Sequence, residues 1–271
     1  MKRLIFSILY DDGYFILSRN FRKQKVGELN WLFRNYNLVD VSFGIDEIII
    51  LDVSKKKNFP SFCKIVEKIS AKVFIPVTAG GGIKSLDNVK ALQSSGVDKI
   101  LLNKLFYCNP KLCKNIADIY GKQFVVGCID YKIINKQIKI LYDKGLQISR
   151  FNLTQAINRM QNIGVGEIIL QSIDKDGTGE GLDIGVLRYI KNIKLTCPLI
   201  LKGGIGKSEH IYAGLKLNNV DAVCTANLFN FIGDSFLRVK NFLLKKNIDV
   251  INWGNINLKE YNNIFKNNND N

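Results

Sequence analysis

The chain has 271 residues, of which 46% are hydrophobic, and its formal net charge is +15. No run reaches the roughly 18 uncharged apolar residues that a membrane span needs, and the lysines are scattered instead of alternating with aromatic residues as in a single-strand nucleic-acid platform. We therefore expect a cytoplasmic protein that binds neither membrane nor nucleic acid. The six cysteines form no CxxC pair and there is one histidine, so we predict no metal site.

Eight short apolar runs, rich in β-branched residues, alternate with helical patterns along the chain. Near-continuous apolar runs are typical of strands that are buried on both faces. The predicted strands are Arg3–Leu9, Glu47–Asp52, Val73–Thr78, Lys99–Leu102, Phe124–Ile129, Glu167–Gln171, Leu199–Leu201 and Ala222–Thr225. The helical patterns lie near residues 29–43, 60–70, 85–95, 109–120, 152–163, 183–192, 207–216 and 232–246. Eight strand–helix pairs in this length predict an α/β fold, a single (βα)8 TIM barrel over residues 1–250.

Three segments depart from this alternation. Residues 131–151 alternate apolar and polar positions around a Lys144-Gly145 turn, which predicts a β-hairpin inserted after the fifth strand. The basic segment 18–27 follows the first strand, and we expect it to form a lid. Residues 251–271 are polar and of low complexity, so we expect a frayed tail.

Three blocks of sequence recur at nearly one offset. Gly81-Gly82-Ile83 returns as Gly203-Gly204-Ile205 after 122 residues, Glu47-Ile-Ile-Ile returns from Glu167 after 120, and the Asp98 block returns at Asp221 after 123. Coincidence explains one such block more easily than three in the same order. The barrel is therefore predicted to consist of two similar (βα)4 half-barrels.

The two glycine loops directly follow the third and seventh strands. Glycines let backbone N–H groups approach an anion, and the following helix N-terminus adds a favourable dipole. Ser85 and Ser208 are candidate caps of those helices. Asn103-Lys104 and Ala226-Asn227 follow the next strand in each half, so two phosphate sites on opposite sides of the mouth are predicted. The alternative is that these glycines only form tight turns.

Carboxylates follow the fifth and sixth strands. Asp130 ends the fifth strand, where a carboxylate at a barrel mouth is a candidate general acid or base. The alternative for Asp130 is a helix cap or an ion pair with Lys132. The run Ser172-Ile-Asp-Lys-Asp-Gly-Thr places Asp174 and Asp176 between the two glycine loops, which favours a role in substrate binding.

Over almost its full length the chain resembles the cyclase (HisF) subunit of imidazole glycerol phosphate synthase. The resemblance is carried by Lys2-Arg3, Asp46-Glu47, Gly80-Gly81-Gly82-Ile83, Gly96-Val-Asp98-Lys99, Ile129-Asp130, Gly166-Glu167, Ser172-Ile-Asp-Lys-Asp-Gly-Thr and Gly203-Gly204. It implies a lyase that accepts ammonia from a glutaminase (HisH-like) partner docked on the N-terminal face of the barrel. The substrate would be a bis-phosphorylated ribulosyl nucleotide, and no metal or cofactor would be needed.

The resemblance also assigns roles to individual residues. Asp130 matches one of two catalytic aspartates, and Asp98 matches a residue beside the glutaminase interface. The residues that would ring the ammonia entrance are Arg3, Lys99 and Glu167. The residues that fall on the phosphate sites are Gly82, Asn103, Asp176, Gly177, Gly204, Ala226 and Asn227, with Lys104 and Lys202 in place of small hydroxyl residues.

The sequence departs from the family at the first strand. The half-barrel offset pairs Asp130 with Leu9, which cannot transfer a proton. Asp11 is a substitute only if the strand is shifted or the loop folds inward. Leu17 replaces an expected basic residue, with Arg19 nearby. These departures resemble a branch linked to acetamidino-sugar formation in surface-polysaccharide biosynthesis. The alternatives are a genuine histidine-pathway cyclase, the related bis-phosphate isomerase, and a non-catalytic scaffold or activator of a partner subunit.

Overall fold

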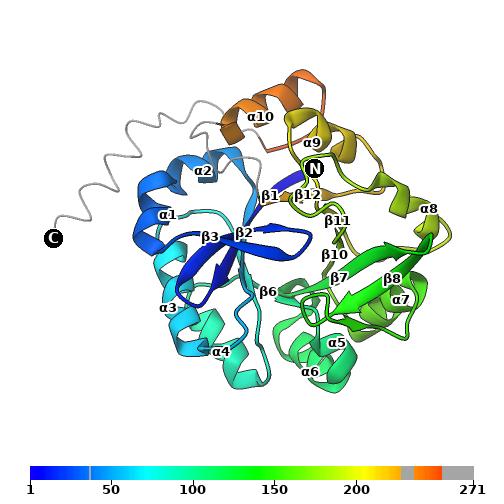
Figure 1. The fold of residues 1–271 in the computed structure, drawn as a ribbon, viewed down its shortest axis with the longest axis horizontal. Helices are drawn as coiled ribbons and strands as arrows, with labels where there is room; N and C mark the ends of the chain where they lie inside the picture. Colours follow the sequence, from blue (N-terminus) through cyan, green and yellow to red (C-terminus); the bar gives the residue numbers. More distant parts are fainter. Residues whose placement is uncertain (37, 227–234, 252–271) are drawn as a thin grey trace.

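The computed structural model describes residues 1–36, 38–226 and 235–251. Eight parallel strands close into a barrel, because β12 pairs with β1 and β7 pairs with β10 (Figure 1). The barrel strands are β1 Arg3–Asp11, β4 Glu47–Asp52, β5 Val77–Gly80, β6 Lys99–Leu102, β7 Val125–Ile134, β10 Glu167–Ser172, β11 Leu199–Lys202 and β12 Ala222–Thr225. The predicted TIM barrel is therefore confirmed.

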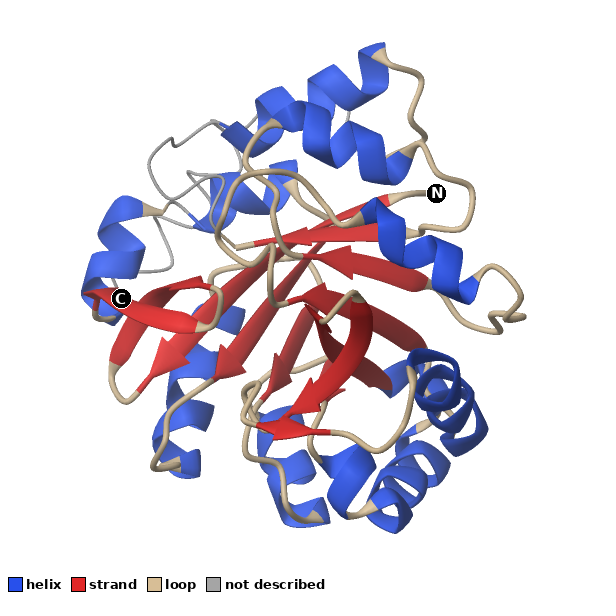
Figure 2. Ribbon diagram, turned by 45° about the vertical axis from the view of Figure 1, so that its right-hand side comes forward, coloured by secondary structure: helices blue, strands red, loops and turns tan. Residues whose placement is uncertain are grey.

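Helices surround the strands (Figure 2). They are α1 Leu29–Asn35, α2 Leu38–Gly44, α3 Phe59–Ser70, α4 Leu86–Ser94, α5 Leu105–Cys108, α6 Pro110–Tyr120, α7 Leu153–Ile163, α8 Leu187–Ile190, α9 Ser208–Leu215 and α10 Ser235–Lys245. Short 3₁₀ turns, η1 Lys122–Phe124 and η2 Ile184–Val186, precede β7 and α8. The segments near 29–43 and 183–192 are helical, as predicted, but neither is one continuous helix. The first is two helices, and the second is reduced to two short turns.

Three predictions about the ends of elements have different outcomes. The Ser85 side chain accepts a backbone N–H bond at the start of α4, as predicted, and Asn109 does the same at the start of α6. Ser208 does not cap α9, because the N-cap position is Lys207, which makes no side-chain cap bond. The third strand begins at Val77, four residues later than predicted, so Val73 lies in the connection before it.

The core has two parts, one inside the barrel and one between barrel and helices. The inner cluster comprises Ile5, Ile49, Leu101, Val126, Cys128, Ile169, Ile200, Ala222 and Cys224, all buried. Their strand neighbours face outward and pack under the helices as a much larger cluster. Side chains alternate along a strand, so a residue two positions before or after a member of the inner cluster also faces the barrel axis.

Antiparallel insertions extend the strand that begins each half-barrel. After β1, the strands β2 Tyr14–Arg19 and β3 Arg22–Gly27 form a hairpin, so the predicted lid is an ordered β-ribbon. After its barrel portion, β7 continues and pairs with β8 Gln137–Tyr142, which pairs with β9 Gln147–Ile148. The predicted turn at Lys144 is therefore the second of two, and the first, at Asn135-Lys136, was missed.

The register of the strands supports the two-half architecture. Ile5 pairs with Glu47 in the first half, as Val126 pairs with Glu167 in the second. The same ladders pair Leu9 with Leu51 and Asp130 with Gln171. Leu9 and Asp130 therefore occupy equivalent positions in the two halves.

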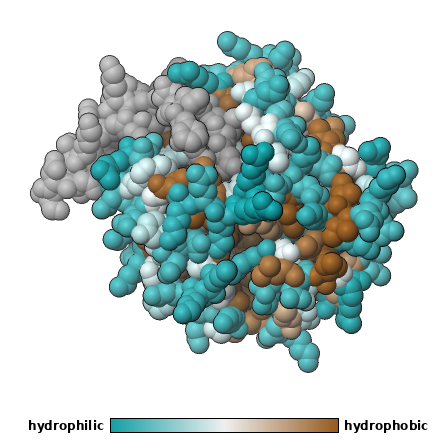
Figure 3. Space-filling view, in the orientation of Figure 1, coloured by the Kyte–Doolittle hydropathy of each residue, from teal (hydrophilic) through white to brown (hydrophobic). Residues whose placement is uncertain are grey.

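The surface of the face in Figure 3 is mostly hydrophilic, with hydrophobic side chains gathered on the right, where β7, β8 and α8 lie. Exposed residues of this region include Ile133, Leu146, Ile148 and Tyr189. Within the described ranges, no helix has both the length and the apolar character needed to cross a bilayer.

Candidate functional site

Four charged side chains close the N-terminal end of the barrel. Arg3 Nη1 lies 3.2 Å from Glu47 Oε2 and 2.9 Å from Glu167 Oε1. Lys99 Nζ lies 2.8 Å and 3.0 Å from the same two oxygens. Each cation thus contacts both acids, and charges of opposite sign compensate each other in a partly buried setting. We call this set, Arg3, Glu47, Lys99 and Glu167, the floor ring.

Glu47 was missed as a member of the floor ring. It is 2% exposed and also accepts a bond of 2.6 Å from Thr78 Oγ1 of β5. The half-barrel offset carried the signal, since it already paired Glu47 with Glu167. Burial raises the pKa of Glu167, but the Lys99 and Arg3 cations outweigh burial and hold that pKa below its ordinary value.

Aspartates that directly precede two of the strands, β6 and β12, join neighbouring strands just outside the floor ring. The Asp98 carboxylate accepts from the Val77 amide at 2.8 Å, while the Asp98 amide donates to the Val77 carbonyl at 2.8 Å. Asp221 makes the same pair of bonds with Leu199 in the second half. Asp98 is exposed, so it lies on the face to which the resemblance assigns the partner.

The two glycine loops have nearly the same backbone. Gly81 and Gly203 have φ of 104° and 107°, and Gly82 and Gly204 have φ of 81° and 95°. A Cβ on Gly81 would lie 2.1 Å from the Asp52 carbonyl oxygen. All four positions favour glycine because of their positive φ, and Gly81, Gly203 and Gly204 also need it for space, since a Cβ there would overlap backbone oxygens. The turn interpretation and the phosphate interpretation both require this geometry, so the loops alone do not decide between them.

Asp130 lies at the C-terminal end of the barrel and is 7% exposed. Asn103 Nδ2 donates to Asp130 Oδ2 at 3.2 Å, and the Cys128 thiol lies 3.4 Å from Asp130 Oδ1. Burial raises the pKa of Asp130 to about 6, although the Cys128 bond and the Lys202 charge lower it. The alternatives of a cap and an ion pair with Lys132 are wrong, because Asp130 lies within β7 and no ion pair joins these two described residues. A carboxyl with this pKa can exchange protons near neutral pH.

The first strand supplies no free carboxylate to match Asp130. Leu9 lies on the same face as Ile5, which belongs to the inner cluster, so its side chain faces the barrel axis. Asp11 ends β1 and forms an ion pair of 2.9 Å with Lys23 of the hairpin. The Asp11 carboxylate is therefore engaged in holding β3.

Lys202 is a buried cation inside the same end of the barrel. It ends β11, two residues after Ile200 of the inner cluster, and is 4% exposed. Its Nζ donates to Ser7 Oγ at 3.1 Å, and Ser7 itself is 2% exposed. Its charge acts on Asp130 and on the thiols of the inner cluster.

The β2–β3 hairpin is held across the mouth by the loop after β10. Asp176 Oδ2 accepts from Ser18 Oγ at 2.5 Å and from the Phe21 amide at 3.2 Å. Asn20 Nδ2 donates to the carbonyls of Ile173 and Asp174 at 3.1 Å and 2.8 Å. A Cβ on Gly177 would overlap the backbone of Ser18, so this glycine lets the two loops touch.

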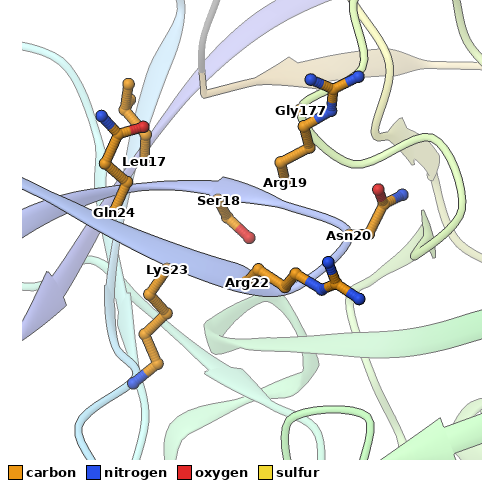
Figure 4. Close-up of a pocket in the computed structure, with 8 residues that line it drawn as sticks. All are labelled: Leu17, Ser18, Arg19, Asn20, Arg22, Lys23, Gln24 and Gly177. Carbon is orange, nitrogen blue, oxygen red and sulfur yellow. The ribbon is translucent and has the colours of Figure 1, made fainter.

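A cavity of about 510 Å³ follows the hairpin and reaches Gly177. Figure 4 shows the Arg19 side chain extending toward Gly177, with Arg22 on the neighbouring strand. Arginine guanidinium groups suit phosphate oxygens. Neither Asp130 nor a residue of the two glycine loops lines this cavity, which lies between the hairpin and the loop after β10.

The comparison with protein families decides the assignment. The model of the family described as "Histidine biosynthesis protein" matches residues 33–233. The chain belongs to this family. It is 42% identical to "Putative imidazole glycerol phosphate synthase subunit hisF2" of Parasynechococcus marenigrum, over 86% of this chain and 87% of that protein. It is 33% identical to "Imidazole glycerol phosphate synthase subunit HisF" of Chlorobaculum parvum, over 92% of this chain and 98% of that protein. It is also 34% identical to "Imidazole glycerol phosphate synthase subunit HisF" of Chlorobium phaeobacteroides, over 76% of this chain and 82% of that protein.

The remaining predicted residues of this HisF-family barrel are placed as follows. Lys104 is exposed and forms an ion pair of 2.8 Å with Asp143 of the second insertion. Ala226 follows β12 and is half-buried, while Asn227 lies outside the described residues. No group of three or more metal-ligating side chains occurs in the described part of the chain.

Proposed function

We propose that this chain is the ammonia-accepting barrel subunit of a glutamine amidotransferase complex. A glutaminase partner would dock on the N-terminal face, beside Asp98, and ammonia would enter through the floor ring. One observation supports this proposal most directly. The charged floor ring and the buried Asp130 lie at opposite ends of one barrel, separated by the inner apolar cluster. Neutral ammonia can cross such a layer far more easily than ammonium can.

At the mouth, the two glycine loops would hold a substrate that carries a phosphate at each end. Gly82 with Asn103 and Lys104 forms the first site, and Gly204 with Asp176, Gly177, Ala226 and Asn227 forms the second. Arg19 lies beside Gly177 and adds a cation to the second site. The hairpin across the mouth would act as the lid, which opens for exchange of substrate and product.

We further propose that the complex works in acetamidino-sugar formation of surface polysaccharides. Leu9 supports this choice, because the position equivalent to Asp130 in the first half offers no proton-transferring group. The alternative is the cyclase reaction of histidine biosynthesis, which is favoured by Asp130 and by the relatives named as synthase subunits. Both alternatives belong in the cytoplasm.

Turnover of the bis-phosphorylated ribulosyl intermediate with ammonium salts separates the two pathways. We expect little or no product from the wild-type protein. Asp11→Ala and Asp130→Ala are the informative variants. Product formation that survives Asp11→Ala but not Asp130→Ala would mean that Leu9 does not disable the cyclase reaction, and would assign the chain to histidine biosynthesis.

A further inference from the structure

The inner face of the barrel mouth contains a buried cation that the proposed function does not use. Lys202 is 4% exposed, and among the residues that the structure describes no carboxylate lies within ion-pair distance of its Nζ. Among the described residues, Lys202 Nζ makes one hydrogen bond, to the neutral hydroxyl of Ser7. A buried ammonium without an acidic partner is unfavourable in a folded protein unless something compensates it.

The charge of the mouth follows from the residues that face it. By strand alternation the upper inner positions hold Ser7, Leu9, Leu51, Asn103, Asp130, Gln171 and Lys202. One is acidic and one is basic, and the position equivalent to Asp130 is apolar. Two carboxylates at the mouth would favour a substrate whose central part becomes positively charged. This mouth, with one carboxylate and one ammonium, accepts a negative group at its centre instead.

We propose that Lys202 binds an anionic group, a carboxylate or an enediolate-type oxygen, at the middle of a substrate whose two ends occupy the glycine loops. The geometry supports this placement, because Lys202 directly precedes the Gly203-Gly204 loop on β11. A lysine at this position therefore lies between the inner cluster and the second phosphate site. The inference rests on the proposed bis-phosphate site and adds a third negative group to the substrate class.

A matched pair of sugar-like probes tests the inference by titration calorimetry. The first probe is a pentitol 1,5-bisphosphate, and the second is the same compound with a carboxylate on carbon 2. We expect the wild-type protein to bind the carboxylated probe at least about ten-fold more tightly. In Lys202→Met this preference should disappear, because the affinity for the carboxylated probe should fall about ten-fold further than the affinity for the plain bisphosphate. Lys114→Met, which removes an exposed lysine of α6, is the control and should leave both affinities unchanged.

Each other outcome has a definite meaning. Equal affinities in the wild-type protein, or a preference that persists in Lys202→Met, would overturn the role of Lys202. Failure of both probes to bind would overturn the bis-phosphate site itself, and with it the proposed function. The wild-type comparison needs no variant, so equal affinities would overturn the inference even if Lys202→Met folds poorly.

Discussion

At the scale of single residues, the mouth chemistry depends on the surroundings of Asp130. Burial raises its pKa to about 6, and Lys202 acts in the opposite direction. A carboxyl whose pKa is raised loses its proton only above that value, so a role as base requires pH above about 6. The same residue in a solvated position would be ionised at all physiological pH values.

The pH dependence of whichever reaction the barrel catalyses should therefore show an acidic limb near pH 6. Asp130→Asn should lower turnover by about 100- to 10,000-fold, as is typical for loss of a general acid or base, and should remove this limb. Lys202→Met should move the limb to higher pH, because it removes a cation that favours the carboxylate. A limb that stays in place in Lys202→Met would show that the two groups do not interact. The measurement is kcat/KM against pH.

The glycine loops make a second prediction at this scale. Gly81 and Gly13 both have positive φ, 104° and 91°, but only Gly81 lacks room for a Cβ. Gly13→Ala should therefore cost only about 1–2 kcal/mol of backbone strain. Gly81→Ala should reduce the free energy of unfolding by about 3 kcal/mol or more, since backbone must also move. Urea unfolding of both variants measures the difference. Equal losses in the free energy of unfolding would mean that the backbone near Asp52 moves away at little cost in free energy.

At the scale of elements, the two insertions meet over the mouth. Lys144, between β8 and β9, donates to the Ser54 carbonyl after β4, while Asn20 of the first hairpin reaches the loop after β10. A Cβ on Gly145 would lie 3.1 Å from the Phe21 ring, so the insertions are in contact. The mouth is therefore bridged from both halves of the barrel.

Removal of the Asn20 bonds should loosen the first hairpin without affecting the barrel. In Asn20→Ala, amides of residues 14–27 should exchange with deuterium about ten-fold faster or more, since two side-chain bonds worth about 1 kcal/mol each are lost. Amides of β4 and β10 should keep their protection. Asn35→Ala, which removes a surface bond to Trp31, is the control. Unchanged exchange in the hairpin would show that its other contacts, among them Asp176 and the Lys23–Asp11 ion pair, hold it without Asn20.

The β2–β3 hairpin was not predicted as a pair of strands from the sequence. The alternating pattern of residues 131–151 predicted an insertion in the second half, and the repeat offset would have placed a counterpart near residues 14–27. That segment is basic on its outer strand, Arg22–Gly27, whose residues are exposed or half-buried. It therefore lacks the apolar alternation by which strands are recognised. The floor ring was missed in part for a similar reason, because Glu47 lies in an apolar run and its partners come from other strands.

At the scale of the whole molecule, the barrel was predictable because its strands are short, buried runs with regular spacing. The floor-ring side chains of β1, β6 and β10 were predictable only through the family resemblance, and Glu47 of β4 was missed. Spacing along the chain does not reveal that Lys99 contacts Glu47 and Glu167. Nor did it reveal that the Asp176 carboxylate binds the hairpin.

The floor ring should contribute measurably to the stability of the barrel. Glu167→Gln removes one acid and leaves two partly buried cations with a single partner, so the free energy of unfolding should fall by about 3 kcal/mol. Because the pKa of Glu167 is lowered, this contribution is present above the ordinary glutamate pKa and is lost as pH falls through the folded value. Urea unfolding at pH 7 and pH 3 measures both effects. Lys114→Ala, which breaks an exposed pair, should cost no more than about 0.5 kcal/mol, and a loss as small for Glu167→Gln would contradict the role of the ring.

The connectivity of the floor ring has a kinetic consequence. Its four ion pairs run in a closed circuit, so displacement of any one side chain breaks two contacts at once. Displacement of one side chain alone is therefore unfavourable, and we expect the floor ring to have two states, closed and open. If ammonia enters here as we propose, its passage through the floor would occur in bursts set by the frequency of opening. A docked partner that supplied one alternative contact to Arg3 or Lys99 would raise that frequency, so delivery could be timed without any movement of the barrel strands.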